Sequence, residues 1–458
     1  MNGSIESQLL DIFRAYDIRG VVPDQLNEKT AFRLGQAFGS SIEEDKGVCV
    51  GRDVRGSSKM IFTSFCKGVI STGVDVIDLG KVPSPVLYFN TLNLNLSGGA
   101  IITASHLPSN WNGVKFCDNK GIVVSDGTGL EIIKKSVSSK PRKPKKIGKI
   151  ILYTNGVDEY VNFLISKVTI ENPPKIVFDF GNSVTANIVP NIMEKLKIKF
   201  SMINADQGKQ IRPSELTSYS LKGLKDEVLK TESDIGIAYD GDGDRVGFVD
   251  DVGNIYPKGE KIIQIFAGSI LEEKKAKIVI DVTCSTSVSK YIIDMGGEPI
   301  IIRVGHSYSA NSVLNLGAMF GAQYSGHYSF PEMNCIDDAI FASFKMIEIL
   351  SKSKKTLHSL ADHLPLSYAS EVLEIECDDK KKFLIIENIA RKVKELGYLS
   401  EQVDGVKFFS NEHKSNWVLI RASNTSPIIR VNADGETKEI VKQLLDQGIT
   451  LVKEAMEK

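Results

Sequence analysis

Three aspartates that alternate with glycines are the strongest chemical signal in the chain. Asp240, Asp242 and Asp244 lie in the segment 240–245, D-G-D-G-D-R, directly after the apolar run 235–239. Alternate residues of an extended segment project to the same side, and glycine lets the backbone fold tightly around an ion. Carboxylate oxygens are ligands that Mg²⁺ prefers. The spacing therefore predicts a magnesium site at the C-terminal end of a buried strand, where open α/β sheets bind ligands.

An EF-hand calcium loop and a solvated acidic turn are the alternatives to this metal site. The EF-hand does not fit, because Arg245 stands where that loop needs glycine, and the flanking segments 235–239 and 246–249 resemble strands instead of helices. The solvated turn stays open, and the metal site is the preferred interpretation.

A second loop carries a candidate nucleophile. The segment 101–115, I-I-T-A-S-H-L-P-S-N-W-N-G-V-K, begins as another buried strand and continues as a polar loop. Ser105 is the natural nucleophile or phosphate carrier, His106 lies beside it, and Lys115 offers a cation or a general acid/base. The alternative is a serine–proline turn without chemistry. A cation site elsewhere in the chain favours the functional interpretation, because serine can then exchange a phosphate group.

Donors that suit a phosphate group gather near the C-terminus. The segment 421–427, R-A-S-N-T-S-P, follows a predicted strand, and another arginine comes three residues later. Arginine offers a bidentate fork, and hydroxyl, amide and backbone N–H groups can fill the remaining phosphate oxygens. The predicted phosphate-binding residues are Arg421, Ser423, Asn424, Thr425 and Arg430.

Two histidine-containing loops suit a sugar ligand. Gln323, Ser325 and His327 stand at alternate positions of one loop and could bind hydroxyl groups, while His306, in the segment 305–307 just after a predicted strand, could add a cation. Together with His106, three of only six histidines fall in loops of this kind. A single histidine is usually structural, but this grouping favours a site.

Strand-like and helix-like runs alternate along most of the chain, which indicates βαβ units with mainly parallel sheets. The clearest predicted strands are 47–50, 74–78, 98–103, 277–282 and 299–304, together with the segment 175–183, in which a strand runs into a Gly-Asn turn. The predicted helices are 30–42, 57–71 and 287–295. From about residue 371, amphipathic helices at 380–396 and 437–457 flank strands at 405–410 and 417–422. The composition of the Pro/Lys/Ser-rich segment 136–146 predicts a solvated connection near a domain boundary. The predicted domains are 1–145, 146–254, 255–368 and 369–458.

The bulk composition excludes several classes of protein. The 458 residues include 42% hydrophobic and 25% charged residues, and 56 Lys+Arg balance 57 Asp+Glu. No global charge draws the chain to nucleic acid or a membrane. No signal peptide and no apolar run of the roughly 20 residues that a membrane helix needs are evident. Six scattered cysteines without a CxxC pair suggest reduced thiols. We therefore expect a cytoplasmic monomer or homodimer.

Taken together, the T-A-S-H loop and the D-G-D-G-D-R loop resemble the α-D-phosphohexomutase superfamily, which includes phosphomannomutase/phosphoglucomutase and phosphoglucosamine mutase. The resemblance covers essentially the whole chain. It implies a heart-shaped protein in which three related α/β domains and a smaller α+β C-terminal domain surround a central cleft. It also implies reversible exchange of phosphate between the 1- and 6-positions of mannose or glucose phosphate, with phosphoserine, Mg²⁺ and a hexose 1,6-bisphosphate. Amino-sugar phosphates, a metal-dependent phosphatase and a weakened regulatory homologue are the alternatives.

The resemblance also implies roles for individual residues. The phosphoserine would be Ser105, which would share the metal with Asp240, Asp242 and Asp244. The remaining catalytic groups would be Arg19, His106, Lys115 and Arg245. The substrate contacts would be Arg14, Tyr16, His306, Gln323, Ser325, His327, Arg421, Ser423, Asn424, Thr425 and Arg430.

Two positions depart from the family pattern. Relatives usually carry glutamate where Gln323 stands, so this chain keeps an acceptor but loses a charge. Many relatives also carry lysine near the position of Thr283. Both departures fall in the sugar-recognition domain, so they bear on the choice of sugar and leave the phosphoryl-transfer residues intact.

Overall fold

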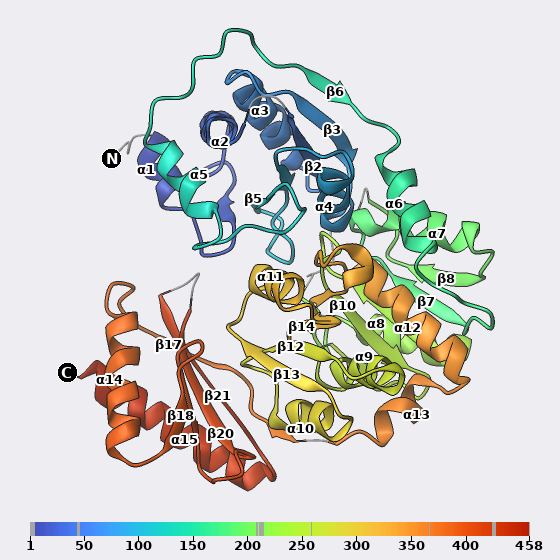
Figure 1. The fold of residues 1–458 in the computed structure, drawn as a ribbon, viewed down its shortest axis with the longest axis vertical. Coiled ribbons are helices and arrows are strands. Elements are labelled where there is room, and N and C mark those ends of the chain that lie inside the picture. Colours follow the sequence, from blue (N-terminus) through green and yellow to red (C-terminus); the bar gives the residue numbers. More distant parts are fainter. Residues whose placement is uncertain are drawn as a thin grey trace.

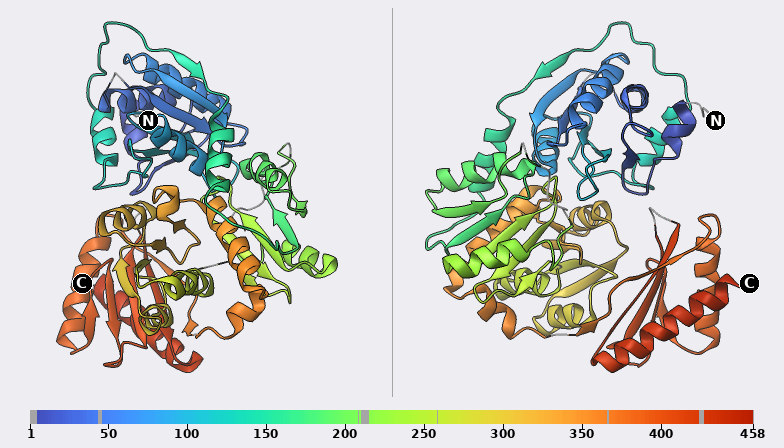
Figure 2. Two further views of the ribbon diagram at one scale, coloured as in Figure 1. Left: turned by 45° about the vertical axis from the view of Figure 1, so that its right-hand side comes forward. Right: turned by 180° about the vertical axis from the view of Figure 1, so that it is seen from behind.

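The computed structural model describes residues 5–43, 46–207, 209, 215–257, 259–365, 367–423 and 427–457. The chain forms four sheets in succession, which lie along an arc from the N-terminal to the C-terminal part (Figure 1). Helices pack beside each sheet, and the C-terminal sheet and its two long helices are separated from the other sheets in Figure 1 and in the right-hand view of Figure 2. This arrangement confirms the predicted fold class of three α/β domains followed by an α+β domain.

The first sheet has the strand order β1-β5-β4-β2-β3-β6. Strands β2, β3, β4 and β6 are parallel to one another, while β5 runs antiparallel to β4 and to β1. The bounds are β1 Ile18–Val21, β2 Val48–Arg52, β3 Val76–Lys81, β4 Gly99–Ile102, β5 Trp111–Cys117 and β6 Ile150–Leu152, with helices α1 Ile5–Leu10, α2 Glu28–Ser41, α3 Ser58–Ile70, α4 Ser84–Asn93 and α5 Leu130–Val137.

The second sheet has the order β11-β10-β9-β7-β8, with parallel β7, β8 and β9 and antiparallel β10 and β11. The bounds are β7 Ile176–Asp179, β8 Phe200–Ile203, β9 Ile235–Tyr239, β10 Val246–Asp250 and β11 Ile255–Tyr256, with helices α6 Gly156–Ile165, α7 Val189–Lys195 and α8 Lys222–Thr231 and the 3₁₀ turn η1 Val184–Asn187. The predicted second domain begins at residue 146, yet β6 pairs with β3, so the chain leaves the first sheet only after Leu152.

The third sheet has the order β13-β12-β14-β15 and again combines parallel strands with one antiparallel strand. The bounds are β12 Lys277–Asp281, β13 Glu298–Ile302, β14 Phe320–Ala322 and β15 Tyr328–Ser329, with helices α9 Glu260–Glu273, α10 Thr286–Asp294, α11 His306–Leu316, α12 Ala339–Ser353 and α13 Leu357–Asp362 and the 3₁₀ turn η2 Pro331–Met333.

The fourth sheet is antiparallel, with the order β16-β21-β20-β19-β18 and with β17 also paired to β21. The bounds are β16 Tyr368–Ala369, β17 Leu373–Glu376, β18 Leu399–Glu401, β19 Val406–Phe409, β20 Trp417–Ala422 and β21 Ile428–Gly435, with helices α14 Lys382–Glu395 and α15 Lys438–Met456. Helix α15 buries one apolar stripe that includes Leu444, Leu451 and Val452, and this periodicity explains why the sequence predicts a helix here.

All four domains place a loop between two adjacent antiparallel strands. The pairs are β4–β5, β9–β10, β14–β15 and β20–β21. Their connections carry the serine loop, the acidic loop, the 323–327 loop and the 423–427 loop, respectively. The four loops that the sequence singles out therefore occupy corresponding positions in four separate sheets.

Packing ties the first three domains together more extensively than it ties the fourth. One apolar cluster contains buried residues from the first three domains, such as Leu87, Phe178 and Phe320. The C-terminal domain has its own cluster, and a small group made of Val282, Phe409, Trp417 and Leu419 joins it to the third domain. No helix within the described residues is both long and apolar enough to cross a membrane.

Candidate active site

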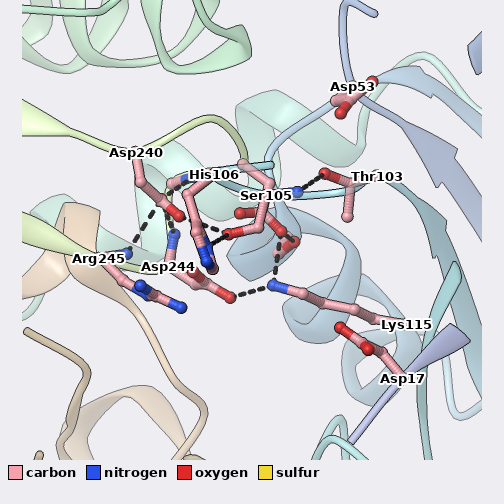
Figure 3. A network of polar contacts seen from close by, with 12 residues as sticks. Asp17, Asp53, Thr103, Ser105, His106, Lys115, Asp240, Asp244 and Arg245 are labelled. Atoms are coloured by element: carbon pink, nitrogen blue, oxygen red, sulfur yellow. Dashed lines mark hydrogen bonds and ion pairs between the residues drawn. The ribbon is translucent and has the colours of Figure 1, made fainter. Parts of the chain in front are cut away.

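The serine loop and the acidic loop meet at one point (Figure 3). The Ser105 hydroxyl donates to Asp240 Oδ2 at 2.7 Å and lies 3.2 Å from His106 Nδ1. Ser105 and all three aspartates of the acidic loop are fully buried. Residues 135 positions apart in the chain therefore share one polar centre.

A buried arginine holds the serine loop in place. The Arg55 guanidinium donates to the backbone oxygens of four loop residues, at 2.7–3.2 Å. Asp53 fixes Arg55 in turn, with Nε and Oδ2 3.2 Å apart. Ser105 itself has a left-handed φ of 50°, a conformation that a non-glycine residue keeps only where its surroundings impose it. The backbone contacts to Arg55 supply that constraint without using the serine hydroxyl.

The acidic loop folds around the Asp240 side chain. Its Oδ1 accepts hydrogen bonds from the backbone N–H groups of Gly243, Asp244 and Arg245, at 3.0–3.2 Å. Gly243 has φ of 74°, so the turn uses the conformational freedom of glycine. Strands β9 and β10 flank the loop, as the apolar runs predict.

The three carboxylates suit a divalent cation. Their ligand oxygens lie within 4.8 Å of one another. Asp242 Oδ1 and Asp244 Oδ1 are buried and have no hydrogen-bond partner among the described residues. Burial raises the pKa of Asp240 well above its ordinary value, and the negative charges of Asp244 and Asp242 raise it further. An excess of buried negative charge with two unpaired oxygens is the environment that a hard cation such as Mg²⁺ relieves.

Positive groups surround the same centre. Lys115 Nζ donates to Asp242 Oδ2 at 2.7 Å and also to Asp244 Oδ2. Burial lowers the pKa of Lys115, but Asp242 and Asp244 outweigh that effect and raise it well above its ordinary value. Arg19 on β1 is fixed by Asp17, with Nε and Oδ2 2.7 Å apart. The field at Ser105 can therefore accommodate a phosphate dianion.

The 323–327 loop reaches this centre through His327. Arg245 Nε donates to His327 Nε2 at 2.9 Å, and His327 Nδ1 lies 2.6 Å from Asp337 Oδ2. The His306 ring stacks on His327, with centroids 4.9 Å apart. Gln323 is 2% exposed, and its Nε2 has no hydrogen-bond partner among the described residues. Ser325 is half-buried.

The two predicted substrate contacts near the N-terminus, Tyr16 and Arg14, have different surroundings. The Tyr16 hydroxyl donates to Val304 O at 2.8 Å, so this residue connects the first and third domains. Arg14 donates from Nη1 to Asp11 O at 3.1 Å within its own turn, and this contact is exposed to solvent.

The predicted phosphate-binding residues form a separate group in the C-terminal domain. Arg421 Nη1 lies 3.8 Å from Asp404 Oδ2, and Arg430 Nε donates to Glu374 Oε1 at 3.0 Å. The Ser423 carbonyl accepts a hydrogen bond from Lys382 Nζ at 2.7 Å. The remaining two predicted residues, Asn424 and Thr425, lie outside the described residues.

Sequence reasoning missed three residues that organise the site. Arg55 acts through loop residues 50–56 positions away in the chain, and Asp337 acts through His327, ten positions away. No local sequence pattern indicates either pairing. Ser84 at the start of α4 donates to Asp242 Oδ2 at 2.8 Å, which joins the first domain to the acidic loop. One sequence feature could have pointed to Asp337, namely the adjacent acids Asp337 and Asp338 directly before an apolar helix.

Comparison with known proteins gives a consistent result. Four family models, described as phosphoglucomutase/phosphomannomutase alpha/beta/alpha domains I, II and III and the C-terminal domain, match residues 10–142, 153–253, 258–368 and 373–450. A probable phosphoglucosamine mutase of Pyrococcus furiosus is 33% identical, and the match covers 97% of this chain and 98% of that protein. A phosphomannomutase/phosphoglucomutase of Pseudomonas syringae is 31% identical over 96% and 94% of the two chains.

Solved structures agree with these sequence matches. A phosphoglucomutase/phosphomannomutase family protein of Burkholderia thailandensis superposes with a TM-score of 0.87 at 26% identity, covering 97% of this chain and 98% of that one. An Aspergillus fumigatus N-acetylphosphoglucosamine mutase, solved with GlcNAc-6P and magnesium, has a TM-score of 0.61 at 12% identity and covers the full length of both chains, and it shows similarity of fold alone.

Proposed function

The chain belongs to the phosphoglucomutase/phosphomannomutase family of phosphosugar mutases, and we propose that it interconverts the 1- and 6-phosphates of glucose or mannose through a phosphoserine at Ser105. The observation that carries this proposal is the contact of the Ser105 hydroxyl with Asp240, beside two buried carboxylate oxygens that have no partner in the part of the chain that the structure describes. A serine beside a cation site, with arginine and lysine around it, is suited to phosphoryl transfer.

Each transfer exchanges one phosphate–oxygen bond for another. Phosphoserine donates its phosphoryl group to the free hydroxyl of a hexose monophosphate, which gives the hexose 1,6-bisphosphate and Ser105. The bisphosphate turns round and returns its other phosphate to Ser105. The attacking hydroxyl loses a proton and the departing Ser105 oxygen gains one, so each transfer conserves the proton. His106 can relay this proton, because its Nδ1 lies 3.2 Å from the Ser105 hydroxyl. Burial, Arg245 and Arg19 hold the pKa of His106 well below the ordinary value, so the imidazole is neutral and passes the proton on instead of keeping it.

The proposed metal would be Mg²⁺ held by Asp240, Asp242, Asp244 and the Ser105 oxygen. Bound there, it would offset the negative charge that two phosphate dianions bring together. Lys115, Arg19 and Arg245 would bind the remaining oxygens of the reacting phosphate.

A coupled assay tests the proposal. Glucose 1-phosphate, mannose 1-phosphate and glucosamine 1-phosphate are each supplied with a catalytic amount of the matching 1,6-bisphosphate. We expect 6-phosphate to form without release of inorganic phosphate. Release of phosphate in step with substrate loss would indicate a phosphatase instead. Glucosamine phosphate is the second candidate substrate, because the relative from Pyrococcus furiosus is a probable phosphoglucosamine mutase.

Replacing one metal ligand should reveal the dependence on Mg²⁺. Asp242→Asn removes a charge and weakens one of three anionic ligands, so activity should fall and the Mg²⁺ concentration needed for half-maximal activity should rise about tenfold or more. The control is Asp294→Asn on the exposed face of α10, which should leave the Mg²⁺ titration unchanged. An identical titration in both variants would mean that 240–245 is an acidic turn without metal.

The C-terminal group would hold the phosphate that is not reacting. Arg421→Ala should raise KM for hexose phosphates by a factor that corresponds to about 2–3 kcal/mol, the value of a charge-assisted hydrogen bond. Arg391→Ala, an exposed arginine on α14, is the matched control and should have the wild-type KM. Equal losses in the two variants would indicate a general effect on the C-terminal domain.

Gln323 should contribute to the choice of sugar. Its Nε2 atom is buried and has no hydrogen-bond partner among the described residues, which suits a group that is completed by substrate. Gln323→Glu introduces a carboxylate that binds sugar hydroxyls more strongly, so the ratio of kcat/KM for glucose and mannose phosphates should change by about tenfold. Gln323→Met, which has similar size and no polar end, should reduce kcat/KM for both sugars. Unchanged ratios and efficiencies in both variants would place sugar recognition elsewhere.

A further inference from the structure

A chain of three side chains links the acidic loop to the third domain. Arg245 Nε donates to His327 Nε2 at 2.9 Å, and the other ring nitrogen of His327 lies 2.6 Å from Asp337 Oδ2. A guanidinium has five donors and no acceptor. His327 Nε2 must therefore carry a lone pair, and the single ring proton must be on Nδ1, where it is donated to Asp337.

The protonation state of His327 agrees with this assignment. Burial lowers the pKa of His327 to about 3, although Asp244 opposes that effect. The imidazole is therefore neutral near pH 7 and exists as one of two tautomers. Burial also raises the pKa of Asp337, but its acceptor role requires only a lone pair on Oδ2.

We propose that Asp337 is a positioning residue for the mutase reaction, because it fixes the tautomer of His327 and thereby the orientation of Arg245 toward Ser105. The inference rests on the proposed role of Arg245 in holding the reacting phosphate. With Nε engaged by His327, the two terminal nitrogens of Arg245 have no hydrogen-bond partner among the described residues. They form a free fork of the kind that binds two phosphate oxygens.

The backbone holds Asp337 rigidly. Asp337 pairs with Ser329 in an isolated β-bridge, and the Asp338 N–H donates to Tyr328 O at 3.0 Å. Asp338 also caps α12, because its Oδ1 accepts a hydrogen bond from the Phe341 N–H at 2.8 Å. The backbone of Asp337 is therefore held between a strand pairing and the start of a helix. A carboxylate on such a backbone can hold the His327 ring in one position.

The arrangement connects two domains. Arg245 belongs to the second domain, while His327 and Asp337 belong to the third. The His306 ring covers one face of His327 at a tilt of 10° and limits rotation of the imidazole. Residues of the third domain thus orient Arg245 of the second domain. The 323–327 loop is in this way connected to the phosphoryl-transfer centre at Ser105.

Three variants of the full-length protein test the inference. Asp337→Ala removes the acceptor, so kcat should fall by between about 10- and 100-fold, while KM for hexose phosphate should stay within about twofold. Asp337→Asn keeps an oxygen acceptor and should recover most of kcat. Asp338→Asn, the same change one residue later, should have wild-type kcat because asparagine keeps the oxygen that caps α12.

A spectroscopic measurement separates positioning from a general structural role. Long-range proton–nitrogen spectra of ¹⁵N-histidine-labelled protein, assigned with a His327→Phe variant, should place the His327 proton on Nδ1 in the wild type and in Asp337→Asn. Asp337→Ala should shift part of the population to the other tautomer. This shift is expected only if Asp337 selects the tautomer.

Several outcomes would overturn the inference. A wild-type His327 with its proton on Nε2 overturns it without any variant, even if Asp337→Ala does not fold. Wild-type kcat in Asp337→Ala also overturns it, as does an equal loss of kcat in Asp338→Asn. If the wild type does not interconvert hexose phosphates at all, the proposed function fails instead, and the spectra still decide whether Asp337 sets the tautomer.

Discussion

Replacing Ser105 with alanine should abolish interconversion of hexose phosphates. The Ser105 hydroxyl contacts both Asp240 and His106, whereas the Ser84 hydroxyl donates to Asp242, so we do not expect Ser84 to carry the phosphate in its place. The loss should be on the order of 10⁴-fold or more, as for removal of a nucleophile in other enzymes. Intact-mass spectra of active wild type should show an adduct of about 80 Da, and the alanine variant should lack it.

The fold of this variant should survive. The Arg55 guanidinium holds the loop through backbone oxygens that alanine retains, so the cost should be one hydrogen bond, about 1 kcal/mol. Ser139→Ala, an exposed serine, is the matched control and should keep full activity. Wild-type turnover in the Ser105 variant would refute the phosphoserine assignment.

The sequence predicts the local parts of this site well, for identifiable physical reasons. The run 235–239 is buried at every residue because β9 lies inside its sheet, so it reads as an unbroken apolar segment. The acidic loop then follows at the strand end. Alternating carboxylates and glycines have few other uses, so the local pattern is specific.

Long-range pairing could not be predicted. Nothing near Arg55 specifies its four contacts to the serine loop, which lies 50–56 residues further along the chain. His327 and Asp337 are only ten residues apart, but no sequence pattern specifies that the imidazole and the carboxylate meet. Strand β6 is a similar case, because its three residues are exposed and lack an apolar alternation, although they pair with β3. Such contacts depend on the tertiary arrangement of elements that are separated along the chain.

The structure also shows that the four loops have equivalent places in their sheets, which the sequence does not indicate. The serine, acidic, 323–327 and 423–427 loops share no sequence pattern, yet each connects two antiparallel neighbours in its own sheet. Because the four loops correspond, each domain can supply one function. In our proposal the first domain transfers phosphate, the second binds the metal, the third recognises the sugar and the fourth holds the second phosphate. Divergence of one loop, as at Gln323, can then change one function and leave the others intact.

Lys115 should be the residue on which the metal-free protein depends most. Lys115 is 3% exposed, and its ammonium pairs with Asp242 and Asp244, both fully buried. Lys115→Met keeps a similar volume but leaves two buried carboxylates without that cation. Removing one partner of a buried ion pair costs about 3–5 kcal/mol. The free energy of unfolding of Lys115→Met, measured in EDTA, should therefore be lower than that of wild type by about that amount. Its mutase activity, measured with Mg²⁺, should also be lower.

Mg²⁺ should restore much of the lost stability, because the cation binds the same carboxylates and can replace part of the missing charge. Thermal unfolding of both proteins in EDTA and in Mg²⁺ measures this effect, and the gain from Mg²⁺ should be larger for Lys115→Met than for wild type. Lys120→Met, at an exposed lysine, controls for loss of a surface charge. A Lys115→Met protein as stable as wild type in EDTA would mean that its two carboxylates are already neutralised by other groups. A destabilised variant that gains no more from Mg²⁺ than wild type would mean that the ion binds away from Asp242 and Asp244.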